Sequence, residues 1–248
     1  MELTIIGCSG SFPGPDSAAS CYLAEAEGFR MLLDLGNGAL GALQRYARLD
    51  EIDAICLSHL HGDHCLDMCG YHVARTYYPE GPLPRIPVYG PPRTAERLDR
   101  VVRLDHGTPM ASAFDFVTLA PGKIEIGPFG VTVDHVNHPV ETFGFRLEHG
   151  GQALAYSADT GPAESLISLA AGADVLLCEA SFTEGGSRPA NLHMTGVQAG
   201  GHAARAGVGQ LVLTHLMPWN SRETALAEAA SAYHGPLSLA VPGSRILG

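Results

Sequence analysis

Residues 57–64 read LSHLHGDH and directly follow a short apolar run, so that three histidines and one aspartate fall within six positions just past an expected strand. In extended chain, side chains two residues apart point the same way, and His59 and His61 can therefore converge on one cation. The adjacent Asp63 and His64 diverge and are better placed to serve a second ion. A helical HExxH motif would instead set its histidines four residues apart on one face. The spacing predicts a loop that supplies two metal ions rather than a polar loop of solvated histidines.

Four side chains are too few to hold two ions, so further ligands must come from elsewhere in the chain. Three segments that follow apolar or alternating runs offer them: VNHPVETFGF with His138, AYSADTGP with Asp159 and LVLTHLMP with His215. We expect these strand ends to lie along one rim of the sheets. A carboxylate such as Asp159 can bridge two cations, which a single imidazole nitrogen cannot do. Imidazole and carboxylate ligands suit zinc, with manganese or iron as alternatives.

The composition limits the class of protein. With 248 residues, 46% of them hydrophobic, and no Ser/Gly-rich or charged linker, we expect one domain over residues 1–248. The start MELTIIGCSG has neither a basic region nor a long apolar run, and no apolar stretch approaches the roughly 20 residues of a membrane helix. The six cysteines are scattered and are expected to be reduced thiols. We therefore expect a cytoplasmic protein without a membrane segment.

The charge balance bears on possible partners. Acidic residues outnumber basic ones 26 to 15, and the net charge of −11 disfavours a long nucleic acid as partner. A local basic stripe is still possible, because four arginines follow one face of an expected helix: Arg93, Arg97, Arg100 and Arg103. Glu96 and Asp99 lie among them as partners at helical spacing, which favours a solvated face over a phosphate-binding one.

Strand patterns open each half of the chain, and helix–strand alternation follows, which predicts two stacked sheets flanked by helices. In the first half, strands are expected at 3–8, 21–26, 29–34, 53–59 and 86–89, and helices within 36–49, 63–78 and the Arg-bearing segment. In the second half, strands are expected at 116–119, 123–126, 131–136, 143–148, 153–157, 173–180, 210–215 and 236–241, and helices at 163–171, 196–206 and 222–233.

The order of these motifs resembles the metallo-β-lactamase superfamily, and within it the ribonuclease Z branch and its smaller phosphodiesterase-like relatives. The stretches that carry the resemblance are GCSGSFPG at 7–14, LLDLGNG at 32–38, SHLHGDH at 58–64, HPVETFGF at 138–145, SADTGP at 157–162, CEASF at 178–182 and HMTG at 193–196. The resemblance implies an α/β fold, a four-layer αββα sandwich of two mixed sheets flanked by helices. It also implies a site for two divalent metal ions at one edge, and a homodimer.

Carried over residue by residue, the resemblance assigns a role to each candidate ligand. One ion would be held by His59, His61 and His138, the other by Asp63, His64 and His215, with Asp159 bridging the two. His135 competes with His138, because it lies three residues earlier on the same expected strand, but the step from His138 to Gly144 fits the family pattern. Asp34 resembles the aspartate that supports the histidine loop from behind, although it could also be a turn or helix-start acid.

The resemblance also supplies catalytic residues. Asp63 would accept or orient the proton of the attacking hydroxide, and His193 would protonate the leaving group with Glu179 as its orienting partner. The neighbours of these residues depart from the family pattern, because Cys178 and Ser181 flank Glu179–Ala180. Because the reacting residue types are kept and only their neighbours differ, the departure affects the identity of the substrate more than the type of reaction.

Candidate substrate-binding residues lie in two small-residue segments. The segment SGSFPG could present backbone N–H groups of Ser9, Gly10 and Ser11 to a phosphate, although such loops often only turn the chain. The HMTG motif adds Thr195.

The sequence favours a compact metal-dependent phosphodiesterase that cleaves a small ester, such as a cyclic nucleotide or a short nucleotide ester, by attack of a metal-bridging hydroxide. Members that process tRNA carry an extra arm that is glycine- and proline-rich or basic, and none is visible between His64 and His138 or between His138 and Asp159. The main alternative is nevertheless the tRNA 3′-end endoribonuclease itself. A lactone or thioester hydrolase of the same fold and a non-catalytic, metal-stabilised module are further alternatives.

Overall fold

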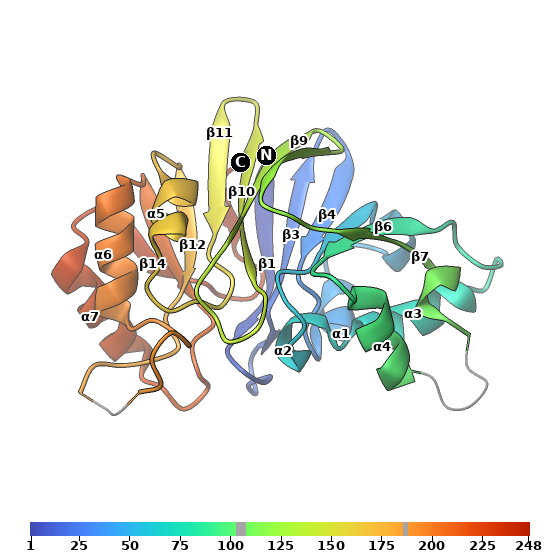
Figure 1. Ribbon diagram of the computed structural model, residues 1–248, viewed down its shortest axis with the longest axis horizontal. Helices are drawn as coiled ribbons and strands as arrows, with labels where there is room; N and C mark the ends of the chain where they lie inside the picture. The colour runs from blue at the N-terminus through green and yellow to red at the C-terminus, as the bar shows by residue number, and fades with distance from the viewer. Residues whose placement is uncertain (103–107, 186–187) are drawn as a thin grey trace.

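The computed structural model describes residues 1–102, 108–185 and 188–248, and it stacks two β-sheets face to face (Figure 1). The first sheet has the order β15-β1-β3-β4-β5-β6-β7, with β2 also paired to β1, and the second has the order β14-β13-β12-β11-β10-β9-β8. The strands of the first sheet are β1 (Glu2–Ser9), β2 (Ala18–Ala19), β3 (Cys21–Ala26), β4 (Phe29–Leu33), β5 (Ala54–Cys56), β6 (Ile86–Gly90), β7 (Phe114–Thr118) and β15 (Arg245–Ile246). Those of the second are β8 (Gly122–Ile126), β9 (Phe129–His135), β10 (Phe143–His149), β11 (Gln152–Tyr156), β12 (Val175–Glu179), β13 (Gln210–Thr214) and β14 (Leu237–Leu239).

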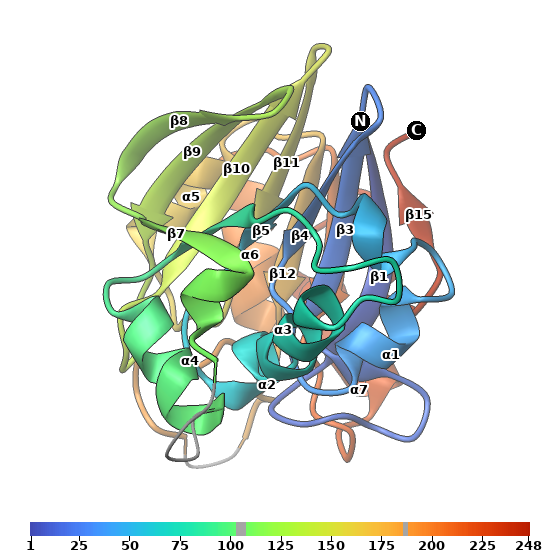
Figure 2. The ribbon, with the colours of Figure 1, turned by 90° about the vertical axis from the view of Figure 1, so that its right-hand side faces the viewer.

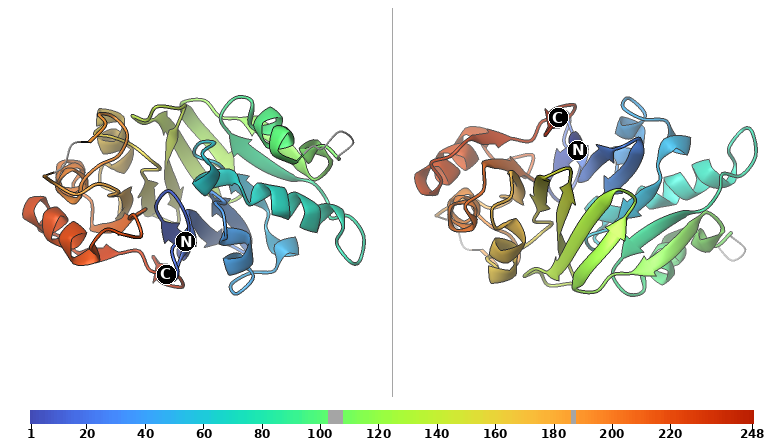
Figure 3. Two further views of the ribbon diagram at one scale, coloured as in Figure 1. Left: turned by 90° about the horizontal axis from the view of Figure 1, so that it is seen from below. Right: turned by 90° about the horizontal axis from the view of Figure 1, so that it is seen from above.

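Both sheets are mixed in the same way. In the first, β1, β3 and β4 are antiparallel, whereas β4 to β7 run parallel. In the second, β8 to β11 form an antiparallel meander and β11 to β14 run parallel. The two termini lie close together, because β15 pairs with β1, as the views from below and above show (Figure 3).

Helices cover the outer face of each sheet. On the first sheet these are α1 (Ala39–Leu43), α2 (Gly62–Cys65), α3 (Met68–Thr76) and α4 (Thr94–Val102), all seen in Figure 2. On the second sheet they are α5 (Glu164–Ala170), α6 (Gly196–Ala206) and α7 (Arg222–Ala232). Short 3₁₀ turns, η1 (Leu49–Glu51) and η2 (Met110–Ser112), complete the first half. This four-layer α/β arrangement confirms the predicted fold class. Of the described helices, none combines the length and apolarity that crossing a bilayer requires.

The main core lies between the two sheets and is built from alternating strand residues. Tyr22, Phe129, Phe143, Phe145 and Tyr156 are its largest members, and each is almost completely buried. Two further hydrophobic clusters lie between a sheet and its helices, one in each half of the sandwich. Burial of a large apolar side chain contributes about 1.5–3 kcal/mol, so these layers hold the sheets at a fixed separation.

The prediction of one continuous helix at 63–78 is wrong, because the structure has two separate helices there, α2 and α3. The break follows from hydrogen bonds to the loop after β4. The His64 carbonyl accepts from Leu35 N at 2.8 Å, and Asp67 N donates to Leu35 O at 3.2 Å. These bonds take backbone groups that one continuous helix would have paired internally.

The parallel strands carry the predicted site residues to one edge of the sandwich. The loop after β5 leads into α2, at the lower edge in Figure 1, and the residues after β11, β12 and β13 end at the same edge. Loops at the carboxyl ends of parallel strands are where α/β folds place their ligands. The fold therefore brings segments 59–64, 159, 179 and 215 together from across the chain.

Candidate metal centre

The backbone is strained at three of the strand ends that form this edge. Asp34, Ala158 and His215 have φ angles of 60°, 50° and 54°, in the left-handed region. Non-glycine residues there cost about 1–3 kcal/mol each in the least favourable cases and cluster at functional sites. The turns direct Asp34, Asp159 and His215 inward, where all three are buried.

The first cluster of possible ligands comprises His59, His61, His138 and Asp159. His61 Nδ1 lies 3.0 Å from His59 Nε2 and 3.2 Å from His138 Nε2. Asp159 Oδ2 is 3.7 Å from His59 Nε2. Tetrahedral zinc with bonds of about 2.0–2.1 Å separates its ligand atoms by about 3.3 Å. The four atoms therefore have the spacing of ligands around one ion.

The second cluster comprises Asp63, His64, Asp159 and His215. His215 Nε2 lies 3.0 Å from Asp63 Oδ2 and 3.2 Å from His64 Nε2. Asp159 Oδ1 is 3.1 Å from His64 Nε2. Asp159 thus turns one oxygen toward each cluster, which is the geometry of a bridging carboxylate.

Asp159 supplies an independent test of whether these residues suit a cation. Its Oδ1 atom is buried and, although His64 Nε2 lies 3.1 Å away, it makes no hydrogen bond of normal geometry in the described part of the chain. A buried, ionised oxygen without a partner is costly and calls for an explanation. A metal ion between Asp159 and the imidazoles would provide that partner. The donor set therefore fits two divalent ions.

The second ring nitrogen of four histidines is held from outside the clusters. His64 Nδ1 donates to Asp34 Oδ2 at 2.8 Å, and His138 Nδ1 donates to Leu192 O at 2.8 Å. His59 Nδ1 lies 3.0 Å from Ser58 Oγ, and His215 Nδ1 lies 2.8 Å from Ser181 Oγ. Each bond leaves the Nε2 lone pair directed at the cluster and so orients the ligand.

Asp34 is the centre of this outer shell. It accepts hydrogen bonds from Ser58 N at 2.7 Å, Ser58 Oγ at 2.8 Å, His64 Nδ1 at 2.8 Å and Tyr156 Oη at 2.8 Å. The sequence indicated Asp34 but missed Ser58, Tyr156 and Ser181. Ser58 could have been found from its place next to His59, whereas nothing in the pattern of β11 distinguishes Tyr156 from a core residue.

The directions of the pKa shifts in the two clusters match a site in which a bound metal ion replaces a proton. Burial opposes ionisation of Asp159, but His215 and His64 outweigh it and hold the pKa of Asp159 well below its usual value. Burial and the neighbouring His64 lower the pKa of His59, so that it is neutral and can donate a lone pair. Burial disfavours charge on His64 as well, but Asp159 and Asp34 raise the pKa of His64. A proton on His64 thus offsets the carboxylates until a cation takes its place.

A buried acid–base pair lies beside both clusters. His193 Nδ1 is 2.8 Å from Glu179 Oε1, and Glu179 also accepts from Thr160 N at 2.9 Å and Ser181 N at 3.0 Å. Burial disfavours the imidazolium, but the Glu179 carboxylate outweighs this effect and raises the pKa of His193 to about 9. The His193 ring centroid lies 5.6 Å from those of both His138 and His215. His193 can therefore hold a proton at the mouth of the site.

The structure brings all seven predicted ligands together and separates them from the competing histidine. His135 is exposed and stacks on Phe143 with ring centroids 4.7 Å apart, away from the clusters. His138, three residues later, lies in the first cluster.

The candidate substrate-binding residues behave differently from one another. Ser11 N lies 3.3 Å from His215 Nε2, so its N–H faces the second cluster. The Ser9 side chain is buried, and Gly10 packs against the His215 carbonyl. Thr195 is also buried, where it caps α6 by accepting from Gln198 N and donates to Glu184 Oε1. The structure therefore gives Thr195 the role of a helix cap instead of a substrate contact.

Two of the three arginines of the stripe that the structure describes pair with one acidic residue. Arg93, just before α4, pairs with Glu96 at 2.7 Å, and Arg100 pairs with the same carboxylate. Arg97 borders a depression of about 420 Å³ beside His61, together with Leu60, Pro91, Pro92, Val140 and Glu141. Arg103 lies outside the described residues.

Comparison with known proteins agrees with this geometry. The model of the β-lactamase superfamily domain matches residues 30–216, which include every candidate ligand. The chain belongs to this superfamily. The resemblance predicted from the motifs is thereby confirmed.

Three relatives cover almost the whole chain. An uncharacterised protein of Mycobacterium leprae, ML1173, is 43% identical over 248 residues, covering 98% of this chain and 87% of its own length. A ribonuclease Z of Mycolicibacterium gilvum is 34% identical over 245 residues, covering 88% of this chain and 85% of its own. The crystal structure of YhfI from Bacillus subtilis, a metallo-β-lactamase fold protein, has a TM-score of 0.88 at 29% identity and covers 100% of this chain and 99% of its own.

Proposed function

We propose that this superfamily member is a binuclear metal-dependent hydrolase that cleaves small phosphodiesters, such as a cyclic nucleotide or a short nucleotide ester. The observation that carries the proposal is the His193–Glu179 pair beside two ligand clusters that share Asp159. The clusters alone would suit several hydrolytic reactions. A positioned proton donor is what departure of an alkoxide from phosphorus requires.

Two divalent ions, zinc before manganese or iron, would polarise a phosphoryl oxygen and lower the pKa of an attacking water. His59, His61 and His138 would hold one ion, and Asp63, His64 and His215 the other, with Asp159 between them. The other residues of the site act on protons. Asp63, slightly exposed at the open side, orients or accepts the proton of the attacking water. His193 donates its proton to the leaving oxygen while Glu179 keeps Nδ1–H in place.

Two features support a small substrate. The net charge of −11 opposes the binding of a long polyanion, and two of the arginines near α4 pair with Glu96. The depression beside His61, of about 420 Å³ and with apolar walls from Leu60, Pro91 and Val140, has the volume of a small-molecule pocket.

The second candidate function is tRNA 3′-end processing. It is favoured by the 34% identity to a protein named ribonuclease Z. It would require this chain to hold a tRNA body, and the arginines described near α4 are mostly paired with Glu96.

The test pairs metal content with turnover. Purified wild-type protein is assayed on bis(p-nitrophenyl) phosphate, on cyclic nucleotides and on a 3′-extended tRNA precursor. We expect two metal ions per chain and turnover of small diesters only. On the cyclic nucleotide, whose alkoxide leaving group needs a proton, His193→Ala should lower kcat at least about 100-fold with metal content unchanged, as expected for loss of a general acid. His135→Ala, an exposed histidine outside the clusters, is the matched control. Efficient cleavage of the tRNA precursor would replace our proposal with the second candidate.

A further inference from the structure

Two exposed aromatic side chains lie next to each other at the rim of the second cluster. Phe12 is 37% exposed and Trp219 is 69% exposed, and their ring centroids are 5.0 Å apart with an interplanar angle of 43°. Single exposed apolar residues are common on protein surfaces and need no explanation. Two rings that contact each other while leaving most of the indole in water are a different case, because water-exposed aromatic surface of this kind can stack on a planar ligand.

Phe12 is connected to the metal centre by the preceding residue. Ser11 N–H faces His215 Nε2 at 3.3 Å, and Ser11 has a φ of 61°, which turns the chain immediately before Phe12. Gly10 N donates to Leu216 O at 2.9 Å. A Cβ atom on Gly10 would lie 2.4 Å from the His215 carbonyl oxygen, so this close approach requires glycine. Phe12 therefore follows a segment packed directly on a candidate ligand.

Trp219 is connected to the same ligand from the other side. Asn220 Nδ2 donates to Ser181 O at 2.8 Å, and the Ser181 hydroxyl contacts His215 Nδ1 at 2.8 Å. Asn220 N also donates to Met217 O at 2.9 Å, which closes the turn that carries the indole. The ring pair is thus held at a fixed place relative to the second cluster.

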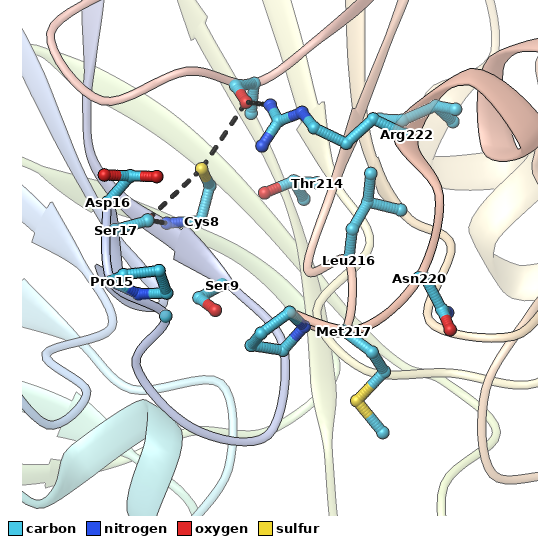
Figure 4. Close-up of a pocket in the computed structure, with 14 residues that line it drawn as sticks. Cys8, Ser9, Pro15, Asp16, Ser17, Thr214, Leu216, Met217, Asn220 and Arg222 are labelled. Carbon is cyan, nitrogen blue, oxygen red and sulfur yellow. Dashed lines mark hydrogen bonds between the residues drawn. The ribbon is translucent and has the colours of Figure 1, made fainter.

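The two loops that bear the rings also face each other across a cavity of about 200 Å³. Ser9 and Pro15 line one side of it and Leu216 and Met217 the other (Figure 4). Its inner end is closed by Cys8, whose thiol donates to Ala240 O at 3.4 Å. The hydrogen bond between Gly10 and Leu216 and the contact between Phe12 and Trp219 both join these two loops.

We propose that Phe12 and Trp219 form a stacking platform for the nucleobase of the substrate. This rests on the proposed phosphodiesterase function and specifies its substrate as a nucleotide ester whose base lies on the Trp219 side of the metal centre. Every base has a π face, so an aromatic platform binds bases without hydrogen-bond selection. The platform recognises a nucleotide but does not distinguish strongly among the bases.

Two other occupants of the ring pair fit the observations less well. A stable subunit interface buries about 800 Å² on each partner, which two side chains cannot supply. An anionic membrane surface would repel a chain of net charge −11. A flat, uncharged ring joined to a phosphate is the partner that matches both the aromatic pair and the neighbouring metal centre.

The kinetic test compares two esters with the same leaving group. Thymidine 5′-(p-nitrophenyl phosphate) carries a base, and methyl p-nitrophenyl phosphate does not. With zinc-loaded protein, Trp219→Ala should lower kcat/KM for the thymidine ester about tenfold, the effect expected for loss of one base–aromatic stack, and change the methyl ester less than twofold. Trp219→Phe should retain most of the activity on the thymidine ester. Tyr77→Ala, which removes an aromatic side chain that is 71% exposed on another part of the surface, should leave both esters unchanged.

A binding test needs no turnover. Trp219 is the single tryptophan of the chain, so its fluorescence reports on this site alone. Thymidine 5′-monophosphate should quench the emission, and ribose 5-phosphate should not. Equal losses on the two esters, or no loss on either, would overturn the platform, and so would the absence of quenching.

Two further outcomes separate the possible failures. A Trp219 emission that changes with protein concentration alone, in step with the mass from light scattering, would assign the rings to a contact between copies and overturn the platform. If wild-type protein turned over neither ester, the proposed phosphodiesterase function would fail, and the quenching titration would decide the platform by itself.

Discussion

Glu179 Oε1 accepts a hydrogen bond from His193 Nδ1 at 2.8 Å, and the same carboxylate is fixed by the backbone N–H groups of Thr160 and Ser181. Glu179 is completely buried and ends strand β12, so its carboxylate is held away from solvent. The arrangement joins a rigid acid to a histidine that faces both ligand clusters. The pair therefore offers a proton at a defined place.

Glu179→Gln should move the alkaline limb of the pH profile. The carboxylate raises the pKa of His193 to about 9, so the imidazolium persists above neutral pH and is lost only as the pH rises through that value. A neutral amide removes the attraction, the pKa of His193 falls, and the alkaline limb of kcat/KM should shift to lower pH by at least about one unit, or about 1.4 kcal/mol. Measuring kcat/KM against pH for the wild type and for Glu179→Gln tests this shift. An unmoved alkaline limb with a uniformly lower rate would mean that Glu179 supports the fold only.

Asp159→Asn should uncouple the two metal positions. The carboxylate turns Oδ2 toward the first cluster and Oδ1 toward the second, and an amide oxygen can serve only one of them. We expect at most one ion per chain by elemental analysis and a fall in kcat of about 1,000-fold or more, because two-metal hydrolysis needs both ions. Asp16→Asn, which changes an exposed carboxylate, is the control.

Removal of metal by a chelator should lower the Tm of the wild type and of Asp159→Asn by different amounts. Each ion present at about 1,000 times its dissociation constant stabilises the native state by about 4 kcal/mol. In a chain of this size that corresponds to a Tm about 10 °C higher for each ion. A chelator should therefore lower the Tm of the wild type, which holds two ions, by about 20 °C and that of Asp159→Asn by at most about 10 °C. Equal shifts in both proteins would show that Asp159 does not hold the ions.

Asp34 should contribute more to stability than any one of its partners. Asp34→Ala leaves the buried donors of Ser58, His64 and Tyr156 without an acceptor, which should cost about 3–5 kcal/mol in the free energy of unfolding. Tyr156→Phe removes one hydrogen bond and should cost about 1 kcal/mol. Urea unfolding of the two metal-free variants measures both values. Similar losses would mean that the hydrogen bond from Tyr156 carries most of the contribution of Asp34.

The sequence predicts the fold, and the gathering of the candidate ligands in one place, for a physical reason. Buried strands are short apolar runs, and residues that follow them must lie at a sheet edge. The order of apolar runs and polar residues therefore predicts that HLHGDH and the later His138, Asp159 and His215 lie on one rim, provided that their strands point the same way. The choice of His138 over His135 rests on the family pattern and agrees with the position of His135 on the solvent side of Phe143.

What the sequence does not reveal depends on contacts between distant segments. The kink between α2 and α3 follows from bonds to Leu35, some thirty residues earlier, and no local propensity encodes it. Thr195 lies in a recognisable motif, yet its hydroxyl is taken by Gln198 N and Glu184. Phe12 and Trp219 are more than two hundred positions apart, and only the pairing of their loops brings the rings together.

Ser181 offers the sharpest test of how the outer shell sets metal affinity. Its hydroxyl donates to the His215 carbonyl at 2.8 Å and accepts from His215 Nδ1–H at 2.8 Å, which leaves Nε2 free to bind a metal. Ser181→Ala removes this constraint while leaving the Glu179–His193 pair in place, because Glu179 binds Ser181 through the backbone N–H. We expect zinc affinity at the second cluster to fall about 10–100-fold, the usual effect of losing such a partner.

The same variant should regain activity when zinc is raised, because only occupancy of the second position has changed. Zinc titrations followed by kcat and by calorimetry measure the shift, and Ser165→Ala, at a half-buried serine bonded to the His135 carbonyl, provides the control. Loss of kcat that saturating zinc does not restore would indicate that Ser181 acts on the reaction itself. In that case the hydroxyl would belong with His193 among the groups that handle protons, and the tautomer of His215 would have to be maintained by another contact.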